Sequence, residues 1–214
     1  MSPCRVLVLY YSRHGSTQQL ARAIARGVES VEGCQAMLRT VPEIALADKV
    51  VAEKEVAEGE TRRTSSDDAC VTLDELKQCD GLAMGSPVWF GNMAAPLKHF
   101  WDQTTTLWVS GDLIDKPACV FTSSSSLHGG QESVQQSLLL PLLHHGMLIM
   151  GIPYSEPELH HTHSGGTPYG ASHVATAEQG SALTAEEKRL AQALGARLAN
   201  TALKLRQTTI KGDR

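Results

Sequence analysis

The stretch that decides the fold runs from Arg5 to Val28 and reads RVLVLYYSRHGSTQQLARAIARGV. Residues 5–11 are mostly aliphatic or aromatic without strict alternation, which is typical of a strand buried on both faces. From Thr17 onward, apolar residues recur every three or four positions, which is the spacing of an amphipathic helix. A short polar loop, 12–17, joins the two. This unit is the expected beginning of a parallel α/β sheet.

Strand and helix patterns alternate along the rest of the chain. The further strands that we expect are 35–41, 81–87, 117–124 and 147–152. The further helices that we expect are 72–79, 93–108, 131–146 and a last helix that begins at Thr184. Pro141 is expected to kink or split its helix. Thr184 and Glu187 have the T-x-x-E spacing of a capping box.

This alternation, without a repeat or a linker, predicts a single domain over 1–214 with a doubly wound α/β fold and helices on both faces of the sheet. The length is ordinary for one domain. Two segments do not fit the alternation. We expect an acidic, polar surface insertion at about 43–70 and a long loop at about 153–182.

Composition and charge exclude several classes of function. The net charge of −4 gives no electrostatic case for nucleic acid or an anionic membrane as partner. The five cysteines lack C-x-x-C spacing, so we expect free thiols and no zinc site. His160, His161 and His163 are expected to lie in a surface loop rather than to bind a metal. Without a signal-peptide pattern or an apolar run of about 20 residues, a cytoplasmic protein is expected, with no membrane insertion.

The first loop has the chemistry of a phosphate site. The N-terminus of a helix carries unpaired N–H groups and a partial positive charge. Ser12, Ser16 and Thr17 add hydroxyl groups, and Gly15 permits close approach of the backbone. Since neither a Walker A nor a G-x-G-x-x-G pattern is present, a monophosphate fits better than a triphosphate. The alternative is that Ser16 and Thr17 only cap the helix.

Two further loops are expected at the same site, because ligands of doubly wound sheets bind beyond the carboxyl ends of the strands. The loops after the first, third and fourth strands begin near Ser12, Gly85 and Thr122. The second loop places Trp89 and Phe90 in the sequence GSPVWFGNM, which suits a flat heterocycle. A phosphate beside a ring describes a nucleotide, and both an adenine nucleotide and flavin mononucleotide (FMN) fit these residues.

Six stretches, in order, carry a resemblance to a known family: VLYYSRHGST, GSPVWFGNM, FWDQTTTLWVSG, GGQE, LLHHGM and GGTPYGA. From about residue 5 to 205, apart from 43–70, the chain resembles the flavodoxin-like WrbA family of FMN-dependent NAD(P)H:quinone oxidoreductases. The resemblance implies a five-stranded parallel sheet of order 2-1-3-4-5. It also implies FMN as cofactor, NADH or NADPH as co-substrate, a quinone as acceptor, and a homotetramer whose pockets are completed by neighbouring subunits.

The resemblance also implies which residues contact the flavin and the substrate. The cofactor residues are Ser12, Arg13, His14, Gly15, Ser16 and Thr17, then Pro87, Val88, Trp89, Phe90, Gly91 and Asn92, then Thr122, Ser123, Ser124, Ser125, Ser126, Gly129 and His144. His144, Trp108 and Tyr154 are the implied catalytic residues, which line the substrate pocket. His144 would donate a hydrogen bond to the quinone oxygen as negative charge develops there.

Two loops depart from the family pattern. Val88 and Trp89 replace the usual Thr and Arg, so a hydroxyl and a cation are lost near the flavin. The third loop, SSSSLHGG, is one residue longer than the family's T-G-T-G-G. Backbone contacts to FMN tolerate both changes, whereas affinity for the nicotinamide and the quinone is expected to change.

The implied reaction is a two-electron, ping-pong transfer from NAD(P)H through FMN to a quinone. The alternative is a flavodoxin-like protein that carries one electron between partners. Such carriers are usually strongly acidic, so the small net charge favours the enzyme, as do the aromatic residues Trp108 and Tyr154.

Overall fold

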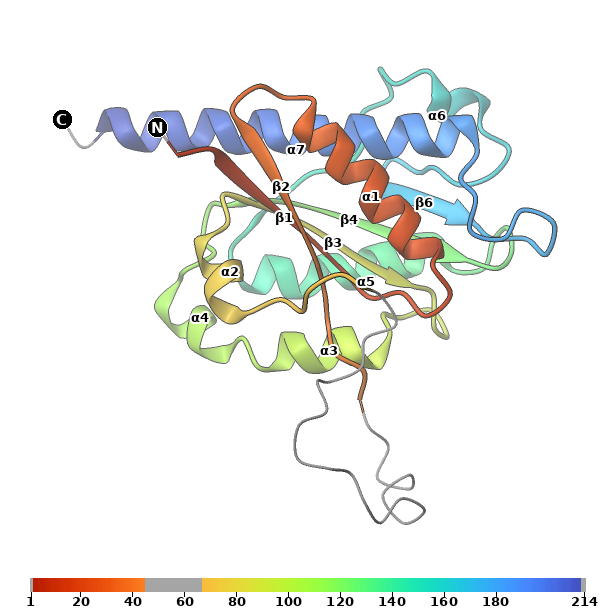
Figure 1. Cartoon of the computed structure of the whole chain (residues 1–214), viewed down its shortest axis with the longest axis horizontal. Coiled ribbons are helices and arrows are strands. Elements are labelled where there is room, and N and C mark those ends of the chain that lie inside the picture. The colour runs from red at the N-terminus through yellow and green to blue at the C-terminus, as the bar shows by residue number, and fades with distance from the viewer. Residues whose placement is uncertain (1, 45–66, 213–214) are drawn as a thin grey trace, which may run out of the picture.

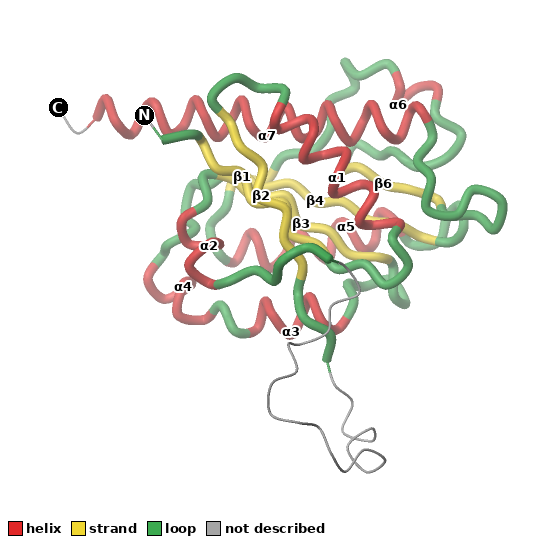
Figure 2. Tube along the Cα trace, viewed as in Figure 1, coloured by secondary structure: helices red, strands yellow, loops and turns green. Residues whose placement is uncertain are grey.

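The computed structural model describes residues 2–44 and 67–212. A central parallel sheet contains β1 (Cys4–Tyr10), β2 (Cys34–Thr40), β3 (Gly81–Pro87), β4 (Pro117–Ser124) and β5 (Leu148–Ile149). Their order is β2-β1-β3-β4-β5, as predicted. Figure 2 shows the sheet in yellow, with helices on both of its faces.

Each face of the sheet has its own apolar core, because side chains alternate along every strand. Val6 and Val8 of β1 pack under α1 (Ser16–Glu29) and α7 (Ala185–Gly212). Leu7 and Leu9 of the same strand face the opposite core. The helices that cover this second core are α2 (Leu73–Gln78), α3 (Ala95–Asp102), α4 (Thr105–Ser110) and α5 (Gln131–His144). The run without strict alternation at residues 5–11 is thus explained by burial on both sides.

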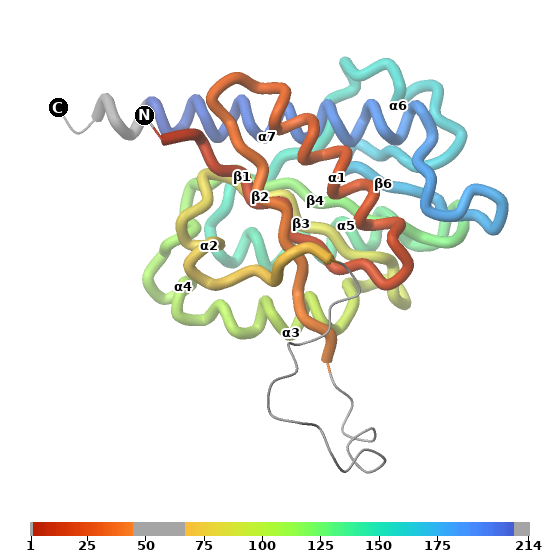
Figure 3. The backbone as a smooth tube through the Cα atoms, viewed as in Figure 1, coloured from red at the N-terminus to blue at the C-terminus, as the bar shows by residue number. Residues whose placement is uncertain are grey.

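The first and last helices lie against each other, as the red and blue tubes in Figure 3 show. Two glycines permit this close approach. A Cβ on Gly27 would lie 2.0 Å from the Gln192 carbonyl oxygen, and one on Gly195 would lie 2.1 Å from the Ile24 carbonyl oxygen. Since no side chain fits in either place, these two positions fix the distance between α1 and α7.

The fifth position of the sheet differs from the prediction. The strand expected over 147–152 is reduced to β5, which pairs only with Pro117 and Ala118. The carboxyl half of β4 instead pairs with β6 (Gly170–Val174). The short helix α6 (Glu158–His161) lies between β5 and β6 in the sequence. The prediction of a long loop at 153–182 was therefore wrong in part, because this range contains α6 and β6. Just after β5 the chain passes close to the segment before β6, since a Cβ on Gly151 would lie 2.0 Å from the Pro168 carbonyl oxygen.

Two expected helices also differ in detail. The helix expected over 93–108 is two helices, because the chain turns at Thr104, whose hydroxyl donates to the Trp101 carbonyl oxygen at 2.7 Å. Helix α5, by contrast, continues through Pro141 and is not split. The predicted capping box is confirmed, with Thr184 N 2.9 Å from Glu187 Oε2 and Glu187 N 3.2 Å from Thr184 Oγ1.

Most of the insertion predicted at 43–70 lies outside the described residues. Where the description resumes, the chain returns beside β2: Thr40 N donates to the Ala69 carbonyl oxygen at 3.0 Å, and Val71 N donates to the Thr40 carbonyl oxygen at 2.9 Å. In the described ranges, no helix is both long enough and apolar enough to cross a membrane.

Candidate functional site

The three predicted loops meet at one cavity of about 350 Å³ beyond the carboxyl ends of β1, β3 and β4. The predicted residues that line it are Ser12, Arg13, His14, Ser16, Thr17, Pro87, Val88, Trp89, Ser123, Ser124 and Ser125. We call this space the three-loop cavity. It lies where the geometry of a doubly wound sheet places ligands.

The first loop presents the start of α1 to the three-loop cavity. Gly15 precedes the helix with φ +91°, a left-handed conformation that favours glycine, and no described side chain caps the helix. Instead, Ser12 Oγ accepts a hydrogen bond from Gly15 N at 3.1 Å, and the Thr17 hydroxyl lies 2.8 Å from Ser123 Oγ. The alternative that Ser16 and Thr17 only cap the helix is therefore not supported. The first amides of α1 suit an anion.

The second loop is a tight turn that places an aromatic wall beside the cavity. Trp89 and Asn92 exchange two backbone hydrogen bonds of 3.0 Å, with Phe90 and Gly91 between them at φ +52° and +75°. The Trp89 ring lines the three-loop cavity, and the Arg13 guanidinium lies 5.7 Å from its centroid. Phe90, Gly91 and Asn92 do not line the cavity, and the Phe90 side chain is fully exposed.

In the third loop, three of the predicted residues shape the backbone rather than line the cavity. The buried Thr122 hydroxyl donates to the Ser86 carbonyl oxygen at 2.7 Å, which ties β4 to β3. The Ser126 carbonyl oxygen accepts from Ser124 Oγ at 2.8 Å. Gly129 lies so close to this carbonyl that a Cβ would come within 2.9 Å of it.

A fourth segment, which the sequence did not indicate, completes the wall. Ala175, Gly180 and Ser181, from the connection between β6 and α7, also line the three-loop cavity. A Cβ on Gly15 would lie 3.9 Å from Ser181 Cβ, so this connection reaches the first loop. Three small residues in a segment without periodicity carry no recognisable signal in the sequence.

A buried ion pair lies directly behind this fourth segment. His173 Nδ1 of β6 lies 2.8 Å from Glu187 Oε2 of α7, and His173 Nε2 lies 3.0 Å from the Gly180 carbonyl oxygen. Since both partners only accept hydrogen bonds, this arrangement fits the imidazolium form, in which both ring nitrogens donate. Burial lowers the pKa of His173, but these two hydrogen bonds outweigh it and raise the pKa above 6.5.

Glu187 is the other member of this pair, and its side chain is completely buried. Burial raises the pKa of Glu187, but hydrogen bonds from His173, Thr184 and Ser164 outweigh it and lower the pKa from 4.5 to about 2. Glu187 also accepts from the amides of Gly165 and Val174. The carboxylate therefore joins α7 to both ends of the segment that contains β6.

Stability is expected to depend on pH through this pair. The lowered pKa of Glu187 means that its contribution, on the order of 3 kcal/mol, is lost as the pH falls from 4.5 to about 2. The raised pKa of His173 means that its contribution is full below pH 6.5 and is lost as the pH rises through the folded-state pKa. Thermal unfolding measured across this range should show both declines. A Glu187→Gln variant whose profile matches the wild type would contradict this assignment.

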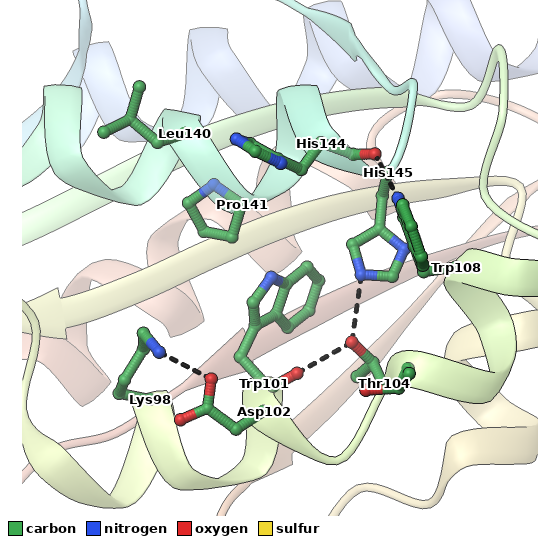
Figure 4. A pocket seen from close by; sticks show the side chains of 10 residues that line it. Lys98, Trp101, Asp102, Thr104, Trp108, Leu140, Pro141, His144 and His145 are labelled. Carbon is green, nitrogen blue, oxygen red and sulfur yellow. Dashed lines mark hydrogen bonds and ion pairs between the residues drawn. The ribbon is translucent and has the colours of Figure 1, made fainter.

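The three implied catalytic residues lie apart from the three-loop cavity within one chain. Trp108 and His144 line a second cavity of about 520 Å³ between α3, α4 and α5, shown in Figure 4. Trp108 Nε1 donates to the His144 carbonyl oxygen at 3.0 Å. The Tyr154 ring lies 5.5 Å from the His160 ring. Within 2–44 and 67–212, no group of three or more acidic, histidine or cysteine side chains is arranged to hold a metal ion.

The fold and the position of the three-loop cavity define the structural class of the protein. It is a flavodoxin-like α/β protein with a candidate site at the carboxyl end of its sheet. The chain belongs to the NADPH-dependent FMN reductase family, whose sequence model matches residues 4–156. The resemblance drawn from the motifs is thereby confirmed.

Individual relatives agree with this assignment. Over 203 residues, the chain is 42% identical to proteins named NAD(P)H dehydrogenase (quinone) from Chromohalobacter salexigens and Geotalea daltonii, with 94% of this chain and 98% of each relative covered. Among solved structures, it is similar to a flavodoxin, WrbA-like protein from Agrobacterium tumefaciens. The TM-score is 0.64 at 25% identity, with 94% of this chain and 98% of that chain covered.

Proposed function

We propose that this protein is an FMN-dependent NAD(P)H:quinone oxidoreductase and that the three-loop cavity holds the FMN. The observation that carries this proposal is the start of α1, where Gly15 at φ +91° leaves the first amides uncapped at the wall of the three-loop cavity. An amide-rich helix start suits the FMN phosphate, and the family match supports the choice of FMN.

Different loops of the three-loop cavity bind different parts of FMN. The amides and hydroxyls of Ser16 and Thr17 bind the phosphate, and the loop 123–125 lines the cavity beside them, with Ser123 Oγ 2.8 Å from the Thr17 hydroxyl. The backbone of 87–89 hydrogen-bonds the edge of the ring system, and Trp89 contacts its face. When bound, FMN supplies a ring that accepts a hydride and passes on two electrons.

Both substrates are proposed to use one ring face in turn, because the sequence offers a single flavin site. NAD(P)H gives up its hydride and leaves as NAD(P)+ before the quinone binds, so double-reciprocal plots of initial rates should be parallel. The test combines those plots with the absorbance spectrum of the protein before and after addition of FMN, and with reduction by NADH alone. Intersecting lines would exclude the ping-pong order. An FMN protein that NADH reduces only in the presence of a partner would instead be an electron carrier.

Trp89→Arg is expected to change the kinetics of NAD(P)H or quinone more than the affinity for FMN. The variant restores the cation usual in the family but removes the cation–π contact with Arg13, worth about 0.5–1 kcal/mol at an exposed site. We expect a change of about two- to fivefold in KM for one substrate. Loss of FMN with unchanged kinetics would show that Trp89 supports the flavin instead.

We further propose a homotetramer in which neighbouring subunits supply the implied catalytic residues. Large apolar side chains are exposed around the second cavity, with Trp108 55% exposed, Val109 73% and Leu140 58%. Burial of this surface against another subunit is favourable. It would also bring Trp108 and His144 to a neighbour's site, which they do not reach within their own chain.

Trp108→Ala and His144→Ala are each expected to lower kcat/KM for the quinone. The fall should correspond to a loss of roughly 1–3 kcal/mol of transition-state stabilisation, because a stacking or hydrogen-bonding contact is lost. FMN should remain bound, because the phosphate loop is unchanged. Sedimentation at the assay concentration should show a tetramer. A fully active monomer would contradict the shared pocket. The buried or half-buried thiols of Cys4, Cys34, Cys79 and Cys119 form no disulfide, which supports a cytoplasmic location.

A further inference from the structure

The connection between β6 and α7, residues 175–183, forms the wall of the three-loop cavity that reaches Gly15 of the phosphate loop. Figure 1 shows it at the same end of the molecule as the start of α1. Its first residue is anchored, since Ala175 N donates to the Ser124 carbonyl oxygen at 2.7 Å. Its far end is anchored by the bond from Thr184 N to Glu187 at 2.9 Å. The middle of the connection is tied to β6 by the hydrogen bond from His173 to Gly180.

We propose that His173 is a positioning residue, which as an imidazolium holds Gly180 and Ser181 against the phosphate loop and thereby sets the affinity for FMN. Ser181 is the residue of the connection that lies nearest Gly15, since a Cβ on Gly15 would lie 3.9 Å from Ser181 Cβ. His173 lies in register with Ser123 of β4, whose hydroxyl bonds Thr17 of the phosphate loop. The proposal rests on the proposed function, namely that the three-loop cavity holds FMN.

The charge on His173 determines whether the connection between β6 and α7 stays hydrogen-bonded to His173 through Gly180. The neutral ring keeps one hydrogen, and the carboxylate of Glu187 retains it at Nδ1 because that bond is charge-assisted. Nε2 then presents a lone pair to the Gly180 carbonyl oxygen at 3.0 Å, so two acceptors face each other and Gly180 moves away. The groups that face His173 are Glu187 of α7, the Gly180 carbonyl and the uncharged Ser123 of β4.

The first test measures the dissociation constant of FMN with the apoprotein, by quenching of flavin fluorescence, between about pH 6.5 and 9.5. The second pKa of a phosphate monoester is about 6, so the phosphate is mostly a dianion at pH 6.5 and almost entirely one above about pH 7. We expect the constant of the wild type to rise about tenfold as the pH passes the pKa of His173. His173→Gln should bind about tenfold more weakly at pH 7, with a flat profile. His163→Gln, an exposed histidine of the preceding loop, is the control and should follow the wild type.

Two further measurements separate positioning from a general structural role. Glu187→Gln removes the charge that stabilises the imidazolium, so the midpoint of the profile should move to lower pH. Riboflavin lacks the phosphate, so its affinity should be the same in His173→Gln as in the wild type. An FMN affinity of His173→Gln that matches the wild type at every pH would overturn this inference alone. A wild type that binds no FMN at any pH would overturn the proposed function and this inference with it.

Discussion

Replacing Glu187 by alanine is expected to destabilise the fold by about 3–5 kcal/mol, the largest loss that we predict for any single substitution. Its carboxylate is fully buried and accepts hydrogen bonds from Ser164, Gly165, His173, Val174 and Thr184. Without it, three backbone amides and a buried imidazole lose their partner, and each unsatisfied group costs about 1–3 kcal/mol. The melting temperature should fall by about 6–20 °C for a chain of this length.

Glu186→Ala is the matched control for this variant. Glu186 lies one residue earlier in the same first turn of α7, where it is half-buried. Its loss removes only a favourable interaction with the helix dipole, worth about 0.3–1 kcal/mol. If Glu187→Ala unfolded at the same temperature as Glu186→Ala, the buried carboxylate would contribute nothing beyond its position in the helix.

Gly15→Val is expected to weaken FMN binding at least about tenfold, or 1.4 kcal/mol. Space is not the obstacle, since a Cβ would lie 3.9 Å from its nearest neighbour, Ser181. The obstacle is φ +91°, which a β-branched residue adopts only at a cost of about 1–3 kcal/mol. The loop relieves this strain by turning the amides of Ser16 and Thr17 away from the phosphate. Titration of the apoprotein with FMN measures the loss directly.

Gly33→Val separates backbone strain from the cofactor site. Gly33 has φ +80° with no other atom near its would-be Cβ, and it lies just before β2, at the amino end of the sheet. The strain is therefore similar but distant from the three-loop cavity. This variant should lose stability and keep the FMN affinity of the wild type. Equal losses of affinity in both variants would indicate that Gly15 acts through stability alone.

The order of the sheet was predicted from the family resemblance, whereas the alternation of strand and helix patterns predicted only that the sheet is parallel and doubly wound. The apolar run before Ser12 is buried on both faces and rich in β-branched and aromatic residues, so its composition marks it as a strand. The strand β6 was missed for the opposite reason. It is equally buried, but Gly170, Ala171 and Ser172 have low β-propensity, and they fit only because β4 lies so close.

The candidate site was predictable to the extent that each residue lies next to a strand end. Eleven of the predicted cofactor residues line one cavity, because parallel strands end at the same edge of the sheet. The pair of His173 and Glu187 was not predictable, since its partners are 14 residues apart on a strand and a helix. The capping box indicated Glu187, but a cap is normally exposed, and the sequence does not show what the other side of the carboxylate contacts.

Strand β4 pairs with β5 along its amino half and with β6 along its carboxyl half. This arrangement affects the stage of synthesis at which the sheet can be completed. Residues 120–124 of β4 end at the three-loop cavity, yet their outer neighbour is residues 170–174, and the carboxylate that binds the amide of Val174 comes only at residue 187. Until that point leaves the ribosome, the nascent chain exposes an open strand edge of the kind that recruits other strands. The capacity to take up a flavin therefore arises late, when almost nine-tenths of the polypeptide has emerged from the ribosome.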